Sequence, residues 1–90
     1  MRVYLHPIPR KYLERLNEPT RSYIEDALAS LEKEPPEGDI KPIVGEPGHF
    51  RVRAGNYRIK WRVEEDNYIL VTHIEPRGQI YKKKSRGSKR

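Results

Sequence analysis

The chain has 90 residues, of which 34% are hydrophobic and 36% are charged, and it contains no cysteine. This length suits one small domain with a modest core, and the lack of thiols excludes disulfide bonds and thiolate metal sites. The 19 lysines and arginines outnumber the 13 acidic residues, which gives a formal net charge of +6 and a pI of about 9.7. Such a charge favours a polyanionic partner, with nucleic acid as the first candidate.

Membrane and export signals are not evident in the sequence. No apolar run approaches the roughly 18 residues of a membrane span, and Met1 is followed directly by a short strand pattern rather than by a signal peptide. We therefore expect a cytoplasmic protein that does not associate with membranes.

The first third of the chain predicts one short strand and a helical hairpin. Residues Arg2–Leu5 alternate as a strand does, and His6, an ordinary turn residue by its position, lies with two prolines where the strand stops. Apolar residues at helical spacing then predict two helices, one opened by Pro9 and reaching Leu16, and one over about 20–33. Neither helix buries its apolar side alone, so we expect both to pack on the apolar face of a sheet.

Residues 35–49 are rich in proline and glycine and are predicted to form a loop. Their glycines lack the spacing of a phosphate-binding loop. Ile40, Ile43 and Val44 are expected to anchor this loop under the sheet edge. His49 could act as a base beside the sheet, although a plain loop position is the simpler interpretation.

Residues 50–64 predict the β-hairpin around which the chain is organised. Apolar and polar side chains alternate on both sides of a turn at residues 54–56, so one face of the hairpin is apolar and aromatic. The other face carries five cations, with no acid between Phe50 and Val63. Like charges on neighbouring strands destabilise a sheet, so we expect this face to bind an anion; the simpler alternative is the ordinary wet side of a half-buried sheet. The five cations are Arg51, Arg53, Arg58, Lys60 and Arg62.

The last third predicts a central strand and a basic tail. Residues 68–74 are apolar at nearly every position, which is typical of a strand covered on both faces; the face of His73 within it is left open. Arg77 and Tyr81 follow where they can lean over the cationic face. The last nine residues hold six cations and no apolar group, so they are expected to be disordered and to add affinity for phosphates that does not depend on sequence.

Together these elements predict an α+β fold. An N-terminal strand, a helical hairpin and a three-stranded antiparallel meander form one twisted sheet, with the helices packed on one face. We expect a single domain over residues 1–83 and a disordered basic tail over residues 84–90.

The stretch from Phe50 to Lys83 resembles the RelE/ParE toxin superfamily of type II toxin–antitoxin systems, and within it the RelE-like mRNA interferases. The hairpin strand Tyr57–Val63 and the P-R-G-x-x-Y ending at residues 76–81 carry the resemblance, the latter in the form of archaeal RelE proteins. The order of elements extends it over roughly residues 1–83. The resemblance implies a toxin that inhibits translation as a ribosome-dependent endoribonuclease. It would cut mRNA in the 30S A site through attack of a 2′-hydroxyl on the adjacent phosphate.

The same resemblance implies partners and site residues. The partners are the ribosome, mRNA and a cognate RelB-like antitoxin, and neither a metal nor a cofactor is needed. The catalytic positions fall on Arg58, Arg77 and Tyr81. Fixed guanidinium groups suit the charge of a reacting phosphate, while a tyrosine can stack on a base or take part in proton transfer. The residues expected to hold RNA are Arg51, Arg53, Lys60, Arg62, Lys82 and Lys83.

One departure from the family pattern concerns the general base. In well-studied relatives the two sheet positions are lysines, one of them proposed as the base, whereas here they are Arg51 and Arg53. Arginine does not lose its proton in a protein. His73, His49, Tyr81, the ribosome or the RNA itself could supply the base, and the sequence does not choose among them.

Two other functions stay open from the sequence. One is a ParE-like toxin that poisons DNA gyrase without cutting RNA, although members of that branch usually lack the full arginine and tyrosine set. The other is an inactive module with the toxin fold that binds only RNA or an antitoxin.

Overall fold

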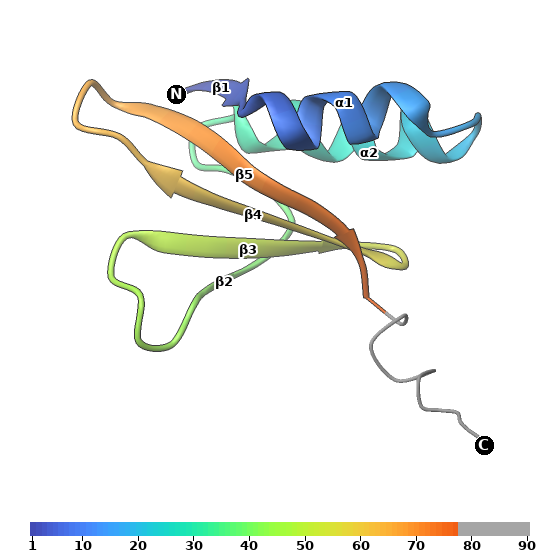
Figure 1. Cartoon of the computed structure of the whole chain (residues 1–90). Coiled ribbons are helices and arrows are strands. Elements are labelled where there is room, and N and C mark those ends of the chain that lie inside the picture. The colour runs from blue at the N-terminus through green and yellow to red at the C-terminus, as the bar shows by residue number, and fades with distance from the viewer. Residues whose placement is uncertain (78–90) are drawn as a thin grey trace.

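Residues 1–77 are described in a computed structural model, and they form the predicted α+β fold (Figure 1). Tyr81, Lys82, Lys83 and the expected tail over residues 84–90 lie outside the described residues. The elements in chain order are β1 (Arg2–Leu5), α1 (Pro7–Arg15), α2 (Thr20–Leu31), β2 (Asp39–Pro42), β3 (His49–Ala54), β4 (Tyr57–Val63) and β5 (Tyr68–Pro76).

The strands form one five-stranded sheet in the order β1-β5-β4-β3-β2. The predicted meander β3-β4-β5 is antiparallel throughout, whereas β1 pairs with β5 in parallel. Both helices lie on the same side of the sheet (Figure 1). The expectation that β5 would be covered on both faces is therefore wrong, and His73 on this strand is exposed.

The sheet has one more strand than predicted, because part of the expected loop over residues 35–49 is β2. This strand pairs antiparallel with β3, with Ile40 opposite Val52. Four residues that end in a proline give a weak strand signal, and a proline is tolerated here because β2 is an edge strand. Ile40 is half-buried against the core as expected, whereas Val44 is 96% exposed and anchors nothing.

Helix α1 begins at Pro7, two residues before Pro9. His6 caps it, since its Nδ1 accepts a hydrogen bond from the backbone N–H of Ile8 at 3.4 Å. A side-chain acceptor at this position satisfies one of the free N–H groups of the first turn, and proline fits the first helical positions. His6 is thus a helix cap rather than a simple turn residue.

The core lies between the helices and one face of the sheet. The helices contribute apolar side chains from one stripe each, and β3 and β4 contribute alternate residues, as the sequence pattern predicts. Phe50 stacks on Trp61 at the margin of this core, with ring centroids 5.8 Å apart. The buried apolar residues are Leu13, Ile24, Leu28, Leu31, Val52, Ala54, Ile59, Trp61, Ile69, Val71 and Ile74.

A β-bulge in β5 breaks the alternation of that strand. Lys60 lies opposite His73, but the next residue of β4, Trp61, lies opposite Val71, so Thr72 is an extra residue. Val71 and Ile74 are both buried, although they are three residues apart. The bulge therefore puts His73 on the outer face, where strict alternation from Val71 would have put it in the core.

Candidate functional site

The outer face of the sheet, away from the helices, carries the five cations predicted to share one side. We call Arg51, Arg53, Arg58, Lys60 and Arg62 the cationic face. Strand pairing arranges them in rows: Arg53, Arg58 and Glu75 are successive neighbours across β3, β4 and β5, and Arg51, Lys60 and His73 form the next row. Neighbouring strands lie about 4.8 Å apart, so each row brings two cations side by side.

Carboxylates partly neutralise this face, which the sequence did not reveal. Glu75 lies between two cations, with its Oε2 at 3.8 Å from Arg58 Nε and 3.6 Å from Lys60 Nζ. Asp39 Oδ2 lies 3.8 Å from Arg51 Nη1. These distances exceed those of good N–H···O hydrogen bonds, and exposed ion pairs of this kind are worth only about 0–1 kcal/mol. A phosphate group can therefore compete with the carboxylates for Arg58 and Lys60.

The remaining cations of the face differ in their contacts. Arg62 Nε donates to the carboxylate of Glu64. Arg53 is exposed and makes no ion pair within residues 1–77. Charge on the cationic face thus exceeds that of its internal partners, and Arg53 is the position most open to an outside anion.

Arg77 lies at one end of the cationic face and ties β5 to the β3–β4 turn. Its Nη1 donates to the carbonyl oxygen of Gly55 at 2.8 Å, and its backbone N–H donates to Asn56 O at 2.6 Å. Gly55 is the first central residue of this two-residue turn and has φ +60°, which favours glycine. Arg77 is half-buried and lies two residues after Glu75, the partner of Arg58, so both predicted catalytic arginines are at the same end of the sheet.

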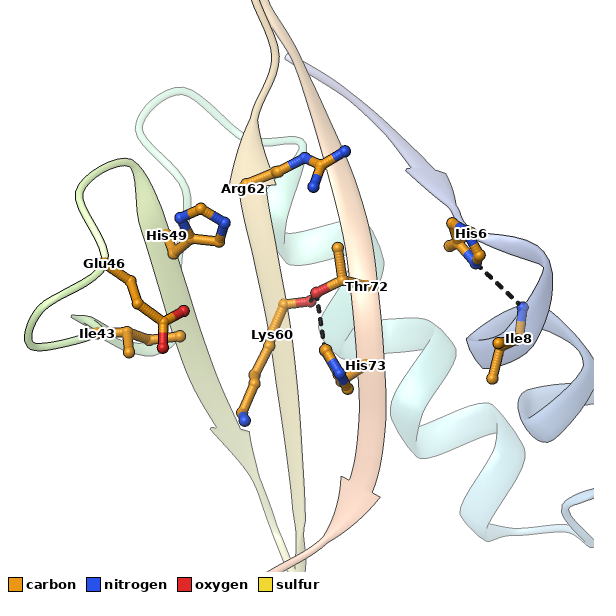
Figure 2. Close-up of a pocket in the computed structure, with 9 residues that line it drawn as sticks. All are labelled: His6, Ile8, Ile43, Glu46, His49, Lys60, Arg62, Thr72 and His73. Carbon is orange, nitrogen blue, oxygen red and sulfur yellow. Dashed lines mark hydrogen bonds between the residues drawn. The ribbon is translucent and has the colours of Figure 1, made fainter.

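A groove of about 510 Å³ opens on the other part of this face (Figure 2). Residues of β4 and β5 lie between a wall from the start of α1 and a wall from the β2–β3 loop and β3. All three histidines of the chain line it. Its lining residues are His6, Ile8, Ile43, Glu46, His49, Lys60, Arg62, Thr72 and His73.

Each of these histidines has a hydrogen-bond partner at Nδ1. His73 Nδ1 lies 2.9 Å from Thr72 Oγ1, and that hydroxyl donates to Lys60 O at 3.4 Å. His49 Nδ1 lies 3.1 Å from Pro47 O. The Nδ1 contacts orient the rings, and within residues 1–77 no Nε2 of these histidines has a hydrogen-bond partner. Sequence reasoning missed this gathering, because it depends on the bulge in β5 and on the cap of α1.

Within residues 1–77, no three histidine or acidic side chains are grouped so that they could hold a metal ion. In the same part of the chain, no helix has both the length and the apolar character that crossing a bilayer requires.

Comparisons with known proteins agree on one family of folds. The sequence matches the family described as "ParE toxin of type II toxin-antitoxin system, parDE" over residues 4–81, whereas none of the curated proteins compared with it matches. The archaeal RelE–RelB complex from Pyrococcus horikoshii OT3 has a chain with TM-score 0.70 and 28% identity, over 87% of this chain and 96% of that one. The RelB–RelE complex from Methanococcus jannaschii has one with TM-score 0.68 and 26% identity, over 86% and 93%.

A third solved structure shares the fold. The toxin–antitoxin complex RelBE2 from Mycobacterium tuberculosis contains a chain with TM-score 0.69 and 20% identity, over 84% of this chain and 96% of that one. The match to the whole of the strand–helix–helix–sheet arrangement confirms the predicted RelE/ParE-like fold.

Proposed function

This chain belongs to the ParE toxin family of type II toxin–antitoxin systems, and we propose that within this family it is a RelE-like endoribonuclease that cuts mRNA on the ribosome. The observation that carries the proposal is the cationic face, where rows of cations are kept side by side at the expense of sheet stability. A groove beside them has room for a nucleotide. The toxin would act in the cytoplasm, where ribosomes translate mRNA.

The proposed reaction is a transfer within the RNA. The 2′-oxygen of one nucleotide attacks the adjacent phosphorus, and the bond to the 5′-oxygen of the next nucleotide breaks. Products are a 2′,3′-cyclic phosphate and a free 5′-hydroxyl. Negative charge builds up on the phosphoryl oxygens, and guanidinium groups already fixed in the site stabilise that charge without reorganising.

Arg58 and Arg77 are assigned this electrostatic role. Arg77 is held in place by the Gly55 carbonyl through one nitrogen, and a guanidinium group has five N–H donors in all, so the others are left for a phosphate. Arg58 would exchange its long contact with Glu75 for a phosphoryl oxygen. Tyr81, by the family resemblance, would stack on a base or move a proton.

The other cations would hold the RNA chain. Phosphate contacts of lysine and arginine give affinity that falls with salt concentration and does not depend on sequence. The residues assigned to this role are Arg51, Arg53, Lys60, Arg62, Lys82 and Lys83.

A second candidate function is favoured by the family match itself, because that family is described by its ParE toxins. A ParE-like toxin would poison DNA gyrase and leave mRNA intact. The arginine pair Arg58 and Arg77, together with Tyr81, favours the nuclease, because a toxin that only binds gyrase has no need of charges placed for a reacting phosphate.

An antitoxin partner is part of the proposal. The similar solved structures of Pyrococcus horikoshii and Methanococcus jannaschii are complexes of RelE with RelB. We infer that a RelB-like antitoxin covers the helical hairpin α1–α2 and the cationic face of this chain. With a net charge of +6 on the toxin, an acidic antitoxin would associate faster at low ionic strength than at high.

Two assays on the same purified chain separate the candidates. In a reconstituted translation reaction with one defined mRNA, we expect the message to be cut only when ribosomes translate it. In a gyrase supercoiling assay at the same concentration, we expect no inhibition. Inhibition of gyrase with intact mRNA would establish the ParE-like function instead, and RNA binding without either effect would leave the inactive module.

A further inference from the structure

We propose that His73 is the general base of this cleavage, held by the bulge in β5 so that its Nε2 faces the groove. This assignment rests on the proposed nuclease function and goes beyond it, because it names the group that removes the proton from the 2′-hydroxyl. The family's lysines do not supply that group here, since Arg51 and Arg53 occupy the two sheet positions.

The backbone of β5 supplies the first reason. An unbroken strand would aim His73 into the core beside Val71, and the extra residue Thr72 is what turns it outward. Bulges of this kind re-aim a side chain and are frequent beside active sites. The outward turn places His73 opposite Lys60, one row from Arg58 and Glu75. Arg58 is therefore the diagonal neighbour of His73 on the facing strand. Such neighbours lie about 7–8 Å apart, a separation that one RNA phosphate and its ribose can span.

The hydrogen bonds of Thr72 supply the second reason. A threonine hydroxyl has one hydrogen, and here it points to Lys60 O at 3.4 Å. We assign the hydrogen of His73 to Nδ1, which lies 2.9 Å from Thr72 Oγ1 (Figure 2), because the threonine oxygen can then accept from the ring while its own hydrogen goes to Lys60 O. In a neutral imidazole the other nitrogen, Nε2, then has a free lone pair. In this assigned tautomer, His73 can take up a proton from the groove.

The other two histidines of the groove are less suitable bases than His73, His6 because of its tautomer and His49 because of its position. His6 Nδ1 accepts from the N–H of Ile8, so its neutral ring carries the hydrogen at Nε2 and presents a donor. His49 shares the tautomer of His73, because Pro47 O can only accept. It is half-buried at the start of β3, however, one row farther from Arg58, where it pairs with Arg62. His6 can hold a phosphoryl oxygen, and His49 is the competitor that an experiment must separate from His73.

Charged or titratable groups from several elements line the groove together with His73. Lys60 on β4 lies beside it and has Glu75 of β5 at 3.6 Å from its Nζ. The other charged or titratable groups of the lining are His6 before α1, Glu46 in the β2–β3 loop, His49 on β3 and Arg62 on β4. Lys60 and Arg62 are the cations of the groove able to hold a phosphate that neighbours the reacting one in the RNA chain, while Arg58 and Arg77 keep the reacting phosphate itself.

The proposed step balances without a metal or an added reagent. His73 Nε2 takes the proton of the 2′-hydroxyl while the 2′-oxygen forms its bond to phosphorus. The bond from phosphorus to the 5′-oxygen breaks, its electron pair stays on that oxygen, and a solvent water supplies the proton it needs. The imidazolium then returns its proton to the solvent.

The test measures single-turnover cleavage of mRNA on translating ribosomes between about pH 5 and pH 9. A histidine base gives a rate that rises with pH through one ionisation and then levels off. His73→Gln keeps the size and the polarity of the side chain but cannot act as a base. We expect it to cleave about 100-fold more slowly or worse, without the rising limb, while melting temperature and ribosome binding are retained. His49→Gln is expected to keep the rising limb.

Chemical rescue gives an independent readout. Imidazole added to His73→Ala should restore part of the lost rate, because a free base can occupy the space of the missing ring. A His73→Gln protein that keeps the rising limb would overturn the assignment, as would loss of that limb in His49→Gln. Loss of ribosome binding in His73→Ala without rescue would also overturn it. If instead the unaltered protein cuts no mRNA, the proposed function itself fails and the role of His73 falls with it.

Discussion

The two faces of the sheet differ in what their side chains do: the inner face is apolar and packs under the helices, and the outer face is charged. On β4, Ile59 is fully buried under the helices, while its neighbour Arg58 lies on the outer face near Glu75. The inner face gains free energy from apolar burial, whereas the outer face keeps like charges side by side, which costs stability. This difference leads us to expect that fold and the proposed function are separable at the scale of one residue. Substitutions at adjacent positions should damage one and spare the other.

Ile59→Ala should have the largest effect on the inner face. The side chain is completely buried between sheet and helices, and truncating such a residue costs about 2–5 kcal/mol of unfolding free energy. Urea unfolding followed by far-UV circular dichroism measures the loss. If the unfolding free energy falls by less than about 1 kcal/mol, the helices do not pack tightly on this face at Ile59.

Arg58→Ala is the matched change on the outer face, one position away. Its ion pair with Glu75 is long and half-exposed, so stability should change by less than about 1 kcal/mol. Ribosome-dependent cleavage should fall about 100-fold or more, as when one fixed donor to a reacting centre is removed. Glu25→Ala serves as the control, since this exposed residue makes no ion pair within residues 1–77. Equal cleavage by both variants would break the comparison between the faces.

Gly55→Ala tests the turn between β3 and β4, to which Arg77 is hydrogen-bonded. A Cβ there would come 2.9 Å from Tyr23 Cε2, and φ is +60°, so we expect a loss of about 1–3 kcal/mol. Gly45→Ala is a matched control, because its φ is +81° but a Cβ there meets nothing within 4 Å. The difference between the two unfolding free energies isolates the clash with Tyr23. If the two losses are equal, that clash relaxes at no cost.

Glu18→Gln should have the smallest effect, confined to acid conditions. Hydrogen bonds from the Ser22 hydroxyl and then from Arg21 lower the pKa of the Glu18 carboxyl from its ordinary 4.5. A carboxyl with a lowered pKa in the folded state stabilises the fold above its unfolded pKa, and that contribution is lost as pH falls through the folded value. The variant's melting temperature should therefore depend less steeply on pH below about 4.5. If the melting temperatures of variant and parent depend on pH in the same way, Glu18 does not contribute to the loss of stability in acid.

The sequence predicted one face of the sheet far better than the other. Strict alternation in the hairpin gave the buried set, including Val52, Ile59 and Trp61, because period two is a local property of a strand. The pairing of Arg58 with Glu75 could not be predicted from the sequence, because it depends on the register across the β4–β5 turn and on the bulge. The bulge cannot be inferred from an apolar run in which either face looks suitable for burial.

Other differences have equally local causes. The strand β2 was missed because Pro42 and nearby glycines favour a loop in a single sequence. The earlier start of α1 depends on a histidine cap, and the usual caps are serine, threonine, asparagine and aspartate. The roles of Arg58, Arg77 and Tyr81 stay predictions from the family resemblance.

Primer extension on mRNA from translating ribosomes tests the division between the faces most directly. With the unaltered protein we expect new 5′ ends within the codon held in the A site, and these ends should vanish with Arg58→Ala while that protein still melts as the parent does. If the parent stops translation and leaves the mRNA uncut, or if Arg58→Ala cuts as well as the parent, the outer face is not a nuclease site.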